Sequence, residues 1–195
     1  MSRLLQILIA SLALAASGVA QATTWNIDPN HSAAQFSVRH MGISTVRGAF
    51  TRVSGTASYD PKDPGKTSID VTIDANSVDT RVERRDNDLR SPNFFDVAKY
   101  PTLTFKSKSA EIAGPGKMKI TGDLTIHGVT KEVVLDVEGP SAAVSDSHGN
   151  SHIGASATTR INRKDFGVNG ASNVVGDEVP IVIDVELVNS PAPTK

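Results

Sequence analysis

The residues of this chain best suited to chemistry are five histidines and one run of charged side chains. His148 and His152 stand four positions apart in the segment SHGNSH, a spacing that on a helix would place both rings on one face, where they could ligate a metal ion. Gly149 and Asn150 lie between them and favour a turn instead, and Asp146 is the only carboxylate close by in sequence. We therefore expect no metal ion here, and no metal or other cofactor elsewhere in the chain.

The other three histidines have structural interpretations. His31 follows Asp28-Pro29-Asn30, a turn signal in which the Asp and Asn side chains cap backbone groups. His40 and His127 lie near the ends of expected strands, so we interpret both as hydrogen-bonded residues at a rim.

The charged run ERRDNDLR, residues 83–90, holds three arginines and three acids. It lies in a stretch without alternation in which Val82 to Leu89 is expected to form about two helical turns, ended by Ser91-Pro92. One interpretation is a solvated helix with internal ion pairs such as Arg84 with Asp88. The other is a lid over the mouth of a cavity, with one arginine facing the polar head of a ligand. The sequence leaves both open, and for the second we choose Arg84.

Two aromatic residues follow this run. Phe94 and Phe95 are expected to fill the core beneath the charged segment, and one of them could also touch the end of an apolar ligand. The chain has no Gly-x-Ser-x-Gly elbow, no phosphate loop and no cysteine, which removes thiol nucleophiles and disulfides. We therefore predict that the protein is not an enzyme. The alternative that remains is an enzyme acting on a lipid through a rim histidine or the acids of the insertion.

The elements that must position these residues are strands. From Met118 to Ile126, apolar residues and Gly122 fall on every second position, and after Gly128 the alternation resumes through Val133, Leu135 and Val137. Such strict alternation on both sides of a short turn predicts a long antiparallel hairpin with one apolar face and one polar face.

Similar alternation recurs along the rest of the chain. The expected strands cover residues 34–40, 46–59 with a bulge or bend at Gly55, 69–75, 102–113, 153–161 and 179–189, in addition to the hairpin. About eight long antiparallel strands with one apolar face form either a two-sheet sandwich or a closed barrel. The inward positions include many small residues, among them Ala34, Ala75, Gly122 and Ala157. A barrel built from them would be underfilled, which points to a cavity.

The chain begins with Arg3, an apolar run from Leu4 to Ala16, and Ala20-Gln21-Ala22, the pattern of a secretory signal peptide cleaved after Ala22. We therefore divide the chain into a signal peptide at 1–22, one β-barrel domain at 23–190 and a flexible tail at 191–195. The net charge is −1 with mixed signs, so neither nucleic acid nor an anionic membrane surface is expected as a partner. No later segment is apolar enough to span a membrane, so no stable membrane insertion is expected after cleavage.

Five segments of the chain resemble the YceI family, in order and with matching gaps over essentially the whole mature chain. They are HSAAQFSVRHMGISTVRGAF, SVDTRVERRDNDLRSPNFFDVAKYPTLTFKS, GDLTIHGVTKEVVLDVE, RKDFG and VGDEVPIVIDVEL. The resemblance implies an all-β fold, an extended antiparallel eight-stranded lipocalin-like β-barrel with a short helical insertion. Ala34 stands where the family commonly has a larger aliphatic residue, which would widen the cavity locally.

The resemblance also implies a function. Members of the family bind a long polyisoprenoid or similar lipid inside the barrel, many are periplasmic, and roles in isoprenoid quinone handling, stress response or the sequestering of lipophilic compounds have been proposed. For this chain we therefore expect non-enzymatic binding, transport or storage of a polyisoprenoid or other long-chain amphiphilic lipid in the periplasm. A scavenger of lipophilic toxic compounds is the alternative, and the sequence leaves a homodimer open.

The side chains expected to contact the ligand combine the inward alternating positions with the insertion. They are Phe36, Val38, Phe50, Val71, Ile73, Arg84, Phe94, Phe105, Ile120, Leu124, Ile126 and Leu135.

Overall fold

The structure is a computed structural model and describes residues 22–189. The predicted signal peptide, except Ala22, and the predicted tail at 191–195 lie outside the described residues. The strands are β1 (Thr23–Ile27), β2 (Ala33–His40), β3 (Ser44–Phe50), β4 (Val53–Tyr59), β5 (Ser68–Asp74), β6 (Val78–Asp79), β7 (Thr102–Gly114), β8 (Lys117–Ile126), β9 (Val129–Glu138), β10 (Val144–Ser145), β11 (Ser151–Asn162) and β12 (Glu178–Asn189). The helices are α1 (Glu83–Arg90) and three 3₁₀ turns, η1 (Pro64–Lys66), η2 (Ala75–Ser77) and η3 (Arg163–Phe166).

Eight of these strands close into an antiparallel barrel, which confirms the predicted fold and excludes the sandwich. The order around the ring is β11-β9-β8-β7-β5-β4-β1-β12, and β11 pairs with β12 along its whole length to close it. Because every ladder joins antiparallel neighbours, the side chains of each strand alternate between the interior and the outer surface. In β8 this alternation gives five buried residues, Met118, Ile120, Gly122, Leu124 and Ile126, as the sequence predicts.

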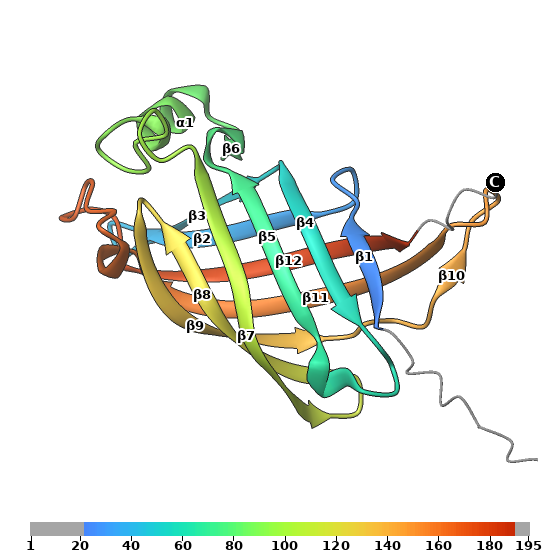
Figure 1. Cartoon of the computed structure of the whole chain (residues 1–195). Helices are drawn as coiled ribbons and strands as arrows, with labels where there is room; N and C mark the ends of the chain where they lie inside the picture. The colour runs from blue at the N-terminus through green and yellow to red at the C-terminus, as the bar shows by residue number, and fades with distance from the viewer. Residues whose placement is uncertain (1–21, 190–195) are drawn as a thin grey trace, which may run out of the picture.

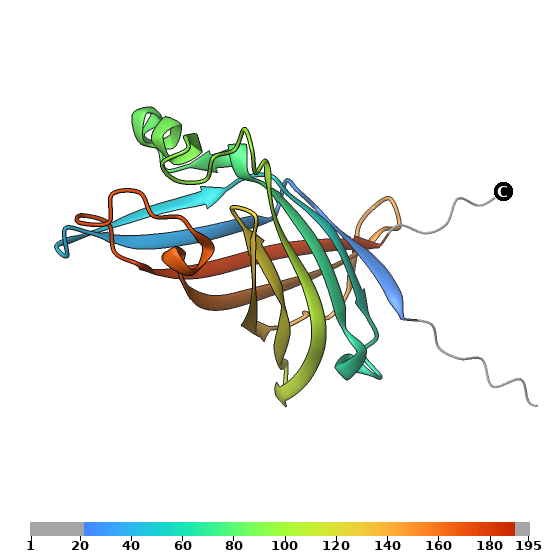
Figure 2. The ribbon, with the colours of Figure 1, turned by 60° about the vertical axis from the view of Figure 1, so that its left-hand side comes forward.

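A hairpin extends the barrel at one end. The C-terminal part of β12 pairs with β1, whereas residues 181–184 of the same strand pair with β2. The β2–β3 hairpin therefore continues past the ring, and α1 and β6 lie above it (Figure 1). The loop from η3 to β12 lies beside this hairpin (Figure 2), where the Met41 amide donates to the Val174 carbonyl over 2.6 Å.

Three details differ from the predicted strands. The run 46–59, expected as one strand, is the separate strands β3 and β4, because the chain turns at Thr51-Arg52 to hydrogen-bond with Ser77. Gly55, expected at a bulge or bend, lies inside β4 with a φ of +144°, and a Cβ there would overlap the Asp70 carbonyl oxygen of β5. The strands β1, β6 and β10 have no counterpart among the predicted elements.

The helix forms where it is expected, but its charges serve a different purpose. The Asp88 carboxylate accepts from the side-chain amide of Asn93 rather than pairing with Arg84. Arg85 donates through Nη2 to the Thr80 carbonyl oxygen over 2.9 Å, and Arg90 donates to the carbonyl oxygen of Val78 over 2.8 Å. These two arginines therefore tie α1 to the backbone that leads into it. Within residues 22–189, no helix has the length and apolar composition needed to cross a lipid bilayer.

Candidate ligand-binding cavity

The interior of the barrel holds a cavity of about 230 Å³ whose exposed wall is apolar. Residues from all eight strands of the ring and from β2 and β3 contribute to its lining, so the cavity extends from the ring into the β2–β3 extension. The small inward residues leave this space unfilled: Ala34, Ala155 and Ala157 all lie on its wall. The prediction of an underfilled barrel is confirmed.

The structure brings eleven of the twelve predicted site residues to this one cavity. They are Phe36, Val38, Phe50, Val71, Ile73, Phe94, Phe105, Ile120, Leu124, Ile126 and Leu135. Period-two alternation selects all of them except Phe94, because in a closed barrel one face of every strand must point inward. That these side chains touch a bound ligand stays a prediction.

Arg84 is the exception, because the structure does not bring it to the cavity with the other eleven. Its side chain lies on the exposed face of α1 and does not line the cavity. The polar side chains of α1 that turn toward the barrel are instead Arg85 and Arg90, together with Asp86, which is buried and accepts from the Thr80 amide over 2.9 Å. An eight-residue helix has one inner face, and these contacts fix which residues occupy it.

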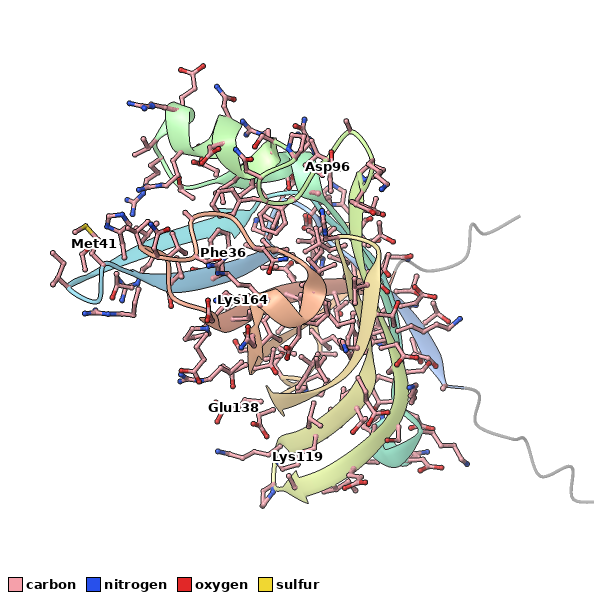
Figure 3. All side chains as sticks on the ribbon, turned by 90° about the vertical axis from the view of Figure 1, so that its left-hand side faces the viewer. Phe36, Met41, Asp96, Lys119, Glu138 and Lys164 are labelled. Carbon is pink, nitrogen blue, oxygen red and sulfur yellow. The ribbon has the colours of Figure 1, made fainter. Side chains whose placement is uncertain are left out.

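Three aromatic rings meet at the end of the cavity below α1. Phe50 lies 5.8 Å from Phe36 and 5.3 Å from Phe95 between ring centroids, the latter in an edge-to-face arrangement. Phe94 is 8% exposed and packs in the same core. Figure 3 views the barrel from this end, with Phe36 on the hairpin, Met41 at its tip and Lys119 on the outer surface of β8. The insertion therefore contributes apolar rings to the cavity.

The position of Phe94 leads to a stability prediction. Phe94→Ala removes a buried ring that packs closely on Gly170, so we expect a loss of about 3–5 kcal/mol in the free energy of unfolding. Urea denaturation of the lipid-free protein measures it. A loss below about 1 kcal/mol would mean that the ring is not part of the core and serves the ligand alone.

The predicted set of lining residues omits several parts of the wall, on β1, β4, β11, β12 and the loop after β11. The inward residues of β12, from Val179 to Leu187, alternate as clearly as those of β8 and could have been included on that signal. The segment after β11 contributes Phe166, Val168 and Val175 to the wall. Its sequence has no periodic pattern that would predict which residues point inward. This loop is therefore a wall of the cavity that only the tertiary structure reveals.

One buried side chain organises that loop. Arg163 in η3 is 5% exposed, and its guanidinium donates to the carbonyl oxygens of Val168 (2.7 Å), Gly170 (2.8 Å), Val175 (3.0 Å) and Gly176 (3.0 Å). A longer contact of 3.4 Å joins it to the Asp177 carboxylate. Burial lowers the pKa of Arg163 from its ordinary value, and these acceptors compensate the buried charge. With its donors engaged by the backbone, Arg163 shapes the cavity wall and leaves no N–H for a ligand.

Comparisons with known proteins agree with this architecture. The model of the YceI-like domain family matches residues 25–187. The protein YceI of Salmonella arizonae is 38% identical over 185 residues, which are 94% of this chain and 95% of that protein. The crystal structure of the Campylobacter jejuni YceI protein superposes with a TM-score of 0.69 at 35% identity, covering 78% of this chain and 90% of that one.

A more distant structure shares the fold. A polyisoprenoid-binding domain from Saccharophagus degradans superposes with a TM-score of 0.63 at 18% identity, covering 88% of this chain and all of that domain. At this identity the similarity concerns the fold alone.

Proposed function

This chain belongs to the YceI-like family, and on that premise we propose that it binds the chain of a polyisoprenoid, such as an isoprenoid quinone, or of a similar long-chain amphiphilic lipid, inside the barrel. The observation that carries the proposal is the cavity itself, an apolar space inside a closed barrel that is bounded by the inward residues of its strands. The polyisoprenoid-binding domain from Saccharophagus degradans has the same fold and takes a ligand of this class.

The physics of the cavity supports a chain-like ligand. A prenyl or alkyl tail has no polar groups, so its binding free energy comes from burial, at roughly 25 cal/mol per Å² of apolar surface. An apolar cavity supplies this burial, and a polar head needs only a few polar groups near an opening. The ligand is bound without chemical change, since the described residues that line the cavity present no nucleophile beside a base.

We further propose that the protein works in the periplasm as a carrier or store of its lipid. The support for this is the sequence pattern of residues 1–22, with Arg3, the apolar run and the small residues at Ala20 and Ala22. N-terminal sequencing of the protein from a periplasmic fraction tests it. The expected first residue is Thr23, and a retained Met1 would contradict the proposed location.

The test of lipid binding uses delipidated protein and two matched probes, a prenyl quinone and the same quinone head without its tail. We expect the prenylated probe to bind more than about 100-fold more tightly, because each buried CH₂ contributes about 0.8 kcal/mol. Native mass spectrometry reads the complex, and extraction of the bound lipid reports whether it is intact.

Each outcome of that experiment has a distinct meaning. An unchanged bound lipid supports the carrier function. A new product would instead indicate that the protein is a lipid-modifying enzyme. Equal affinity for the two probes would contradict recognition of the tail. Binding of small lipophilic compounds in preference to the prenylated probe would favour the scavenger.

A further inference from the structure

Outside the lipid cavity, the turn between β1 and β2 is fixed against β12 at Glu186. The Asp28 amide donates to the Glu186 carbonyl oxygen over 2.9 Å, and the Glu186 amide donates to the Ser32 hydroxyl over 3.1 Å. Residues from both ends of the turn thus hold the backbone of Glu186, and Ser32 is itself buried. The side chains of the turn and of Glu186 consequently have a defined relative position.

Three potential metal ligands converge there. The Nδ1 atom of His31 lies 2.7 Å from Oδ2 of Asp28, and the ligand atoms of Asp28, His31 and Glu186 all lie within 4.8 Å of one another. Asp28 and Glu186 come from opposite ends of the chain, so the folded barrel alone assembles the group. Sequence reasoning interpreted His31 as a turn residue, because the approach of Glu186 is invisible in a local pattern.

A second histidine fixes the orientation of Glu186. The His152 ring lies between two carboxylates, with Nδ1 at 2.7 Å from Oε1 of Glu186 and Nε2 at 3.2 Å from Oδ2 of Asp146. Asp146 accepts from three donors, which are the backbone amides of His148 and Asn150 and the side chain of Asn150. These contacts fix the far end of the hydrogen-bonded series from Glu186 through His152 to Asp146. A hydrogen-bonded carboxylate of this kind is a usual feature around metal ligands.

The carboxylates of the cluster have imidazole rings as their basic neighbours. Among the described residues, the basic groups within 4.0 Å of Asp28, Asp146 and Glu186 are all histidine rings. A divalent cation would therefore meet no lysine or arginine of the described residues within that distance of these carboxylates.

We propose that Asp28, His31 and Glu186 bind a divalent transition-metal ion of the Zn²⁺ class, with His152 as a positioning residue for Glu186. One imidazole nitrogen with two carboxylates favours such an ion over Ca²⁺ or Mg²⁺, which take oxygen ligands. Zinc bonds of about 2.0–2.2 Å place tetrahedral ligand atoms roughly 3.4 Å apart. The ligand atoms of Asp28 and His31, which are 2.7 Å apart, would move slightly apart, and the longer separations of up to 4.8 Å would shorten. The fourth position is left for water.

The ion would connect the turn after β1 with β12. Ile27 and Leu187, the neighbours of Asp28 and Glu186, are register partners in the β1–β12 ladder and both line the cavity. Bound metal would therefore stabilise the pairing of β1 with β12, because an ion that binds only the folded chain stabilises the folded state.

The test is Zn²⁺ titration of tag-free protein from which metal has been removed by a chelator, followed by calorimetry and the thermal midpoint. We expect one Zn²⁺ per chain and a higher thermal midpoint, with no competition from millimolar Mg²⁺. His31→Ala should weaken binding at least about 100-fold, and His152→Ala should weaken it by about 10–100-fold, as outer residues of metal sites do. His31 is 64% exposed, so its removal leaves the fold intact.

Two control variants make the result specific. His40→Ala removes a histidine from the other end of β2 and should leave the affinity for Zn²⁺ unchanged. His148 lies four residues before His152, and its side chain is 83% exposed. The variant His148→Ala should therefore also leave the affinity for Zn²⁺ unchanged. The proposal is overturned if the wild type takes up no stoichiometric Zn²⁺, if His31→Ala binds normally, or if either control loses as much affinity as His31→Ala.

Discussion

Ala157→Trp is expected to abolish most lipid binding while the barrel stays folded. Ala157 lies on β11 opposite Ile183 of β12 and Val137 of β9, and its methyl group is part of the cavity wall. An indole at this position extends into the middle of the cavity and divides it. Excluding about 100 Å² of ligand surface costs about 2.5 kcal/mol, which is close to a hundredfold increase in Kd.

The matched control is Thr158→Trp, one residue along the same strand. Thr158 points to the outer surface and is exposed, so the same indole there should leave the Kd unchanged. Isothermal calorimetry with a prenyl quinone measures both variants, and the thermal midpoint without lipid reports folding. Because the new ring fills empty space, the midpoint of Ala157→Trp should stay within a few degrees of the wild type. Undiminished affinity in this variant would place the ligand outside the barrel.

The wall of the cavity could be predicted from sequence wherever a strand supplies it. In β8 and β9 the pattern repeats every second residue, and in a closed antiparallel barrel that local rule also decides the global direction of each side chain. Ile120 and Leu135, which lie opposite each other in the hairpin, were therefore identifiable without knowledge of any other strand. The same rule would have found Ile183.

The rest of the site depends on contacts that no local pattern encodes. Arg84 and Arg85 are adjacent and identical in type, and only the contact of Arg85 with Thr80 decides which one faces inward. Similarly, His31 and Glu186 are separated by most of the chain and meet because β1 pairs with β12. The short strand β1 was missed because its five residues offer too few positions for a clear period.

Replacing Arg163 with methionine is expected to lower the stability of the protein strongly. The substitution removes the guanidinium from four backbone carbonyls in the loop between η3 and β12, and each buried acceptor left unpaired costs about 1–3 kcal/mol. We therefore expect a loss of at least about 3 kcal/mol in the free energy of unfolding. Arg163→Lys should not restore it, because a lysine has three donors at one point rather than five on a planar fork.

The control is Arg160→Met, three residues earlier in the chain. Its side chain is 58% exposed and pairs with Glu178 at the surface over 3.0 Å, so its loss should cost less than about 1 kcal/mol. Urea denaturation compares the variants, and hydrogen exchange of the Val168 and Gly176 amides reports the loop directly. Equal losses in Arg163→Met and Arg160→Met would show that the buried hydrogen bonds do not organise the loop.

The same variant connects stability to ligand binding. Phe166, Val168 and Val175 line the cavity and lie in or beside the loop that Arg163 holds, so a loosened loop exposes that part of the wall to water. We expect the folded fraction of Arg163→Met to bind a prenyl quinone at least tenfold more weakly, although no donor of Arg163 is free to contact the ligand. Affinity equal to that of Arg160→Met would mean that the ligand does not use the wall formed by this loop, and would confine it to the space enclosed by the eight strands of the ring.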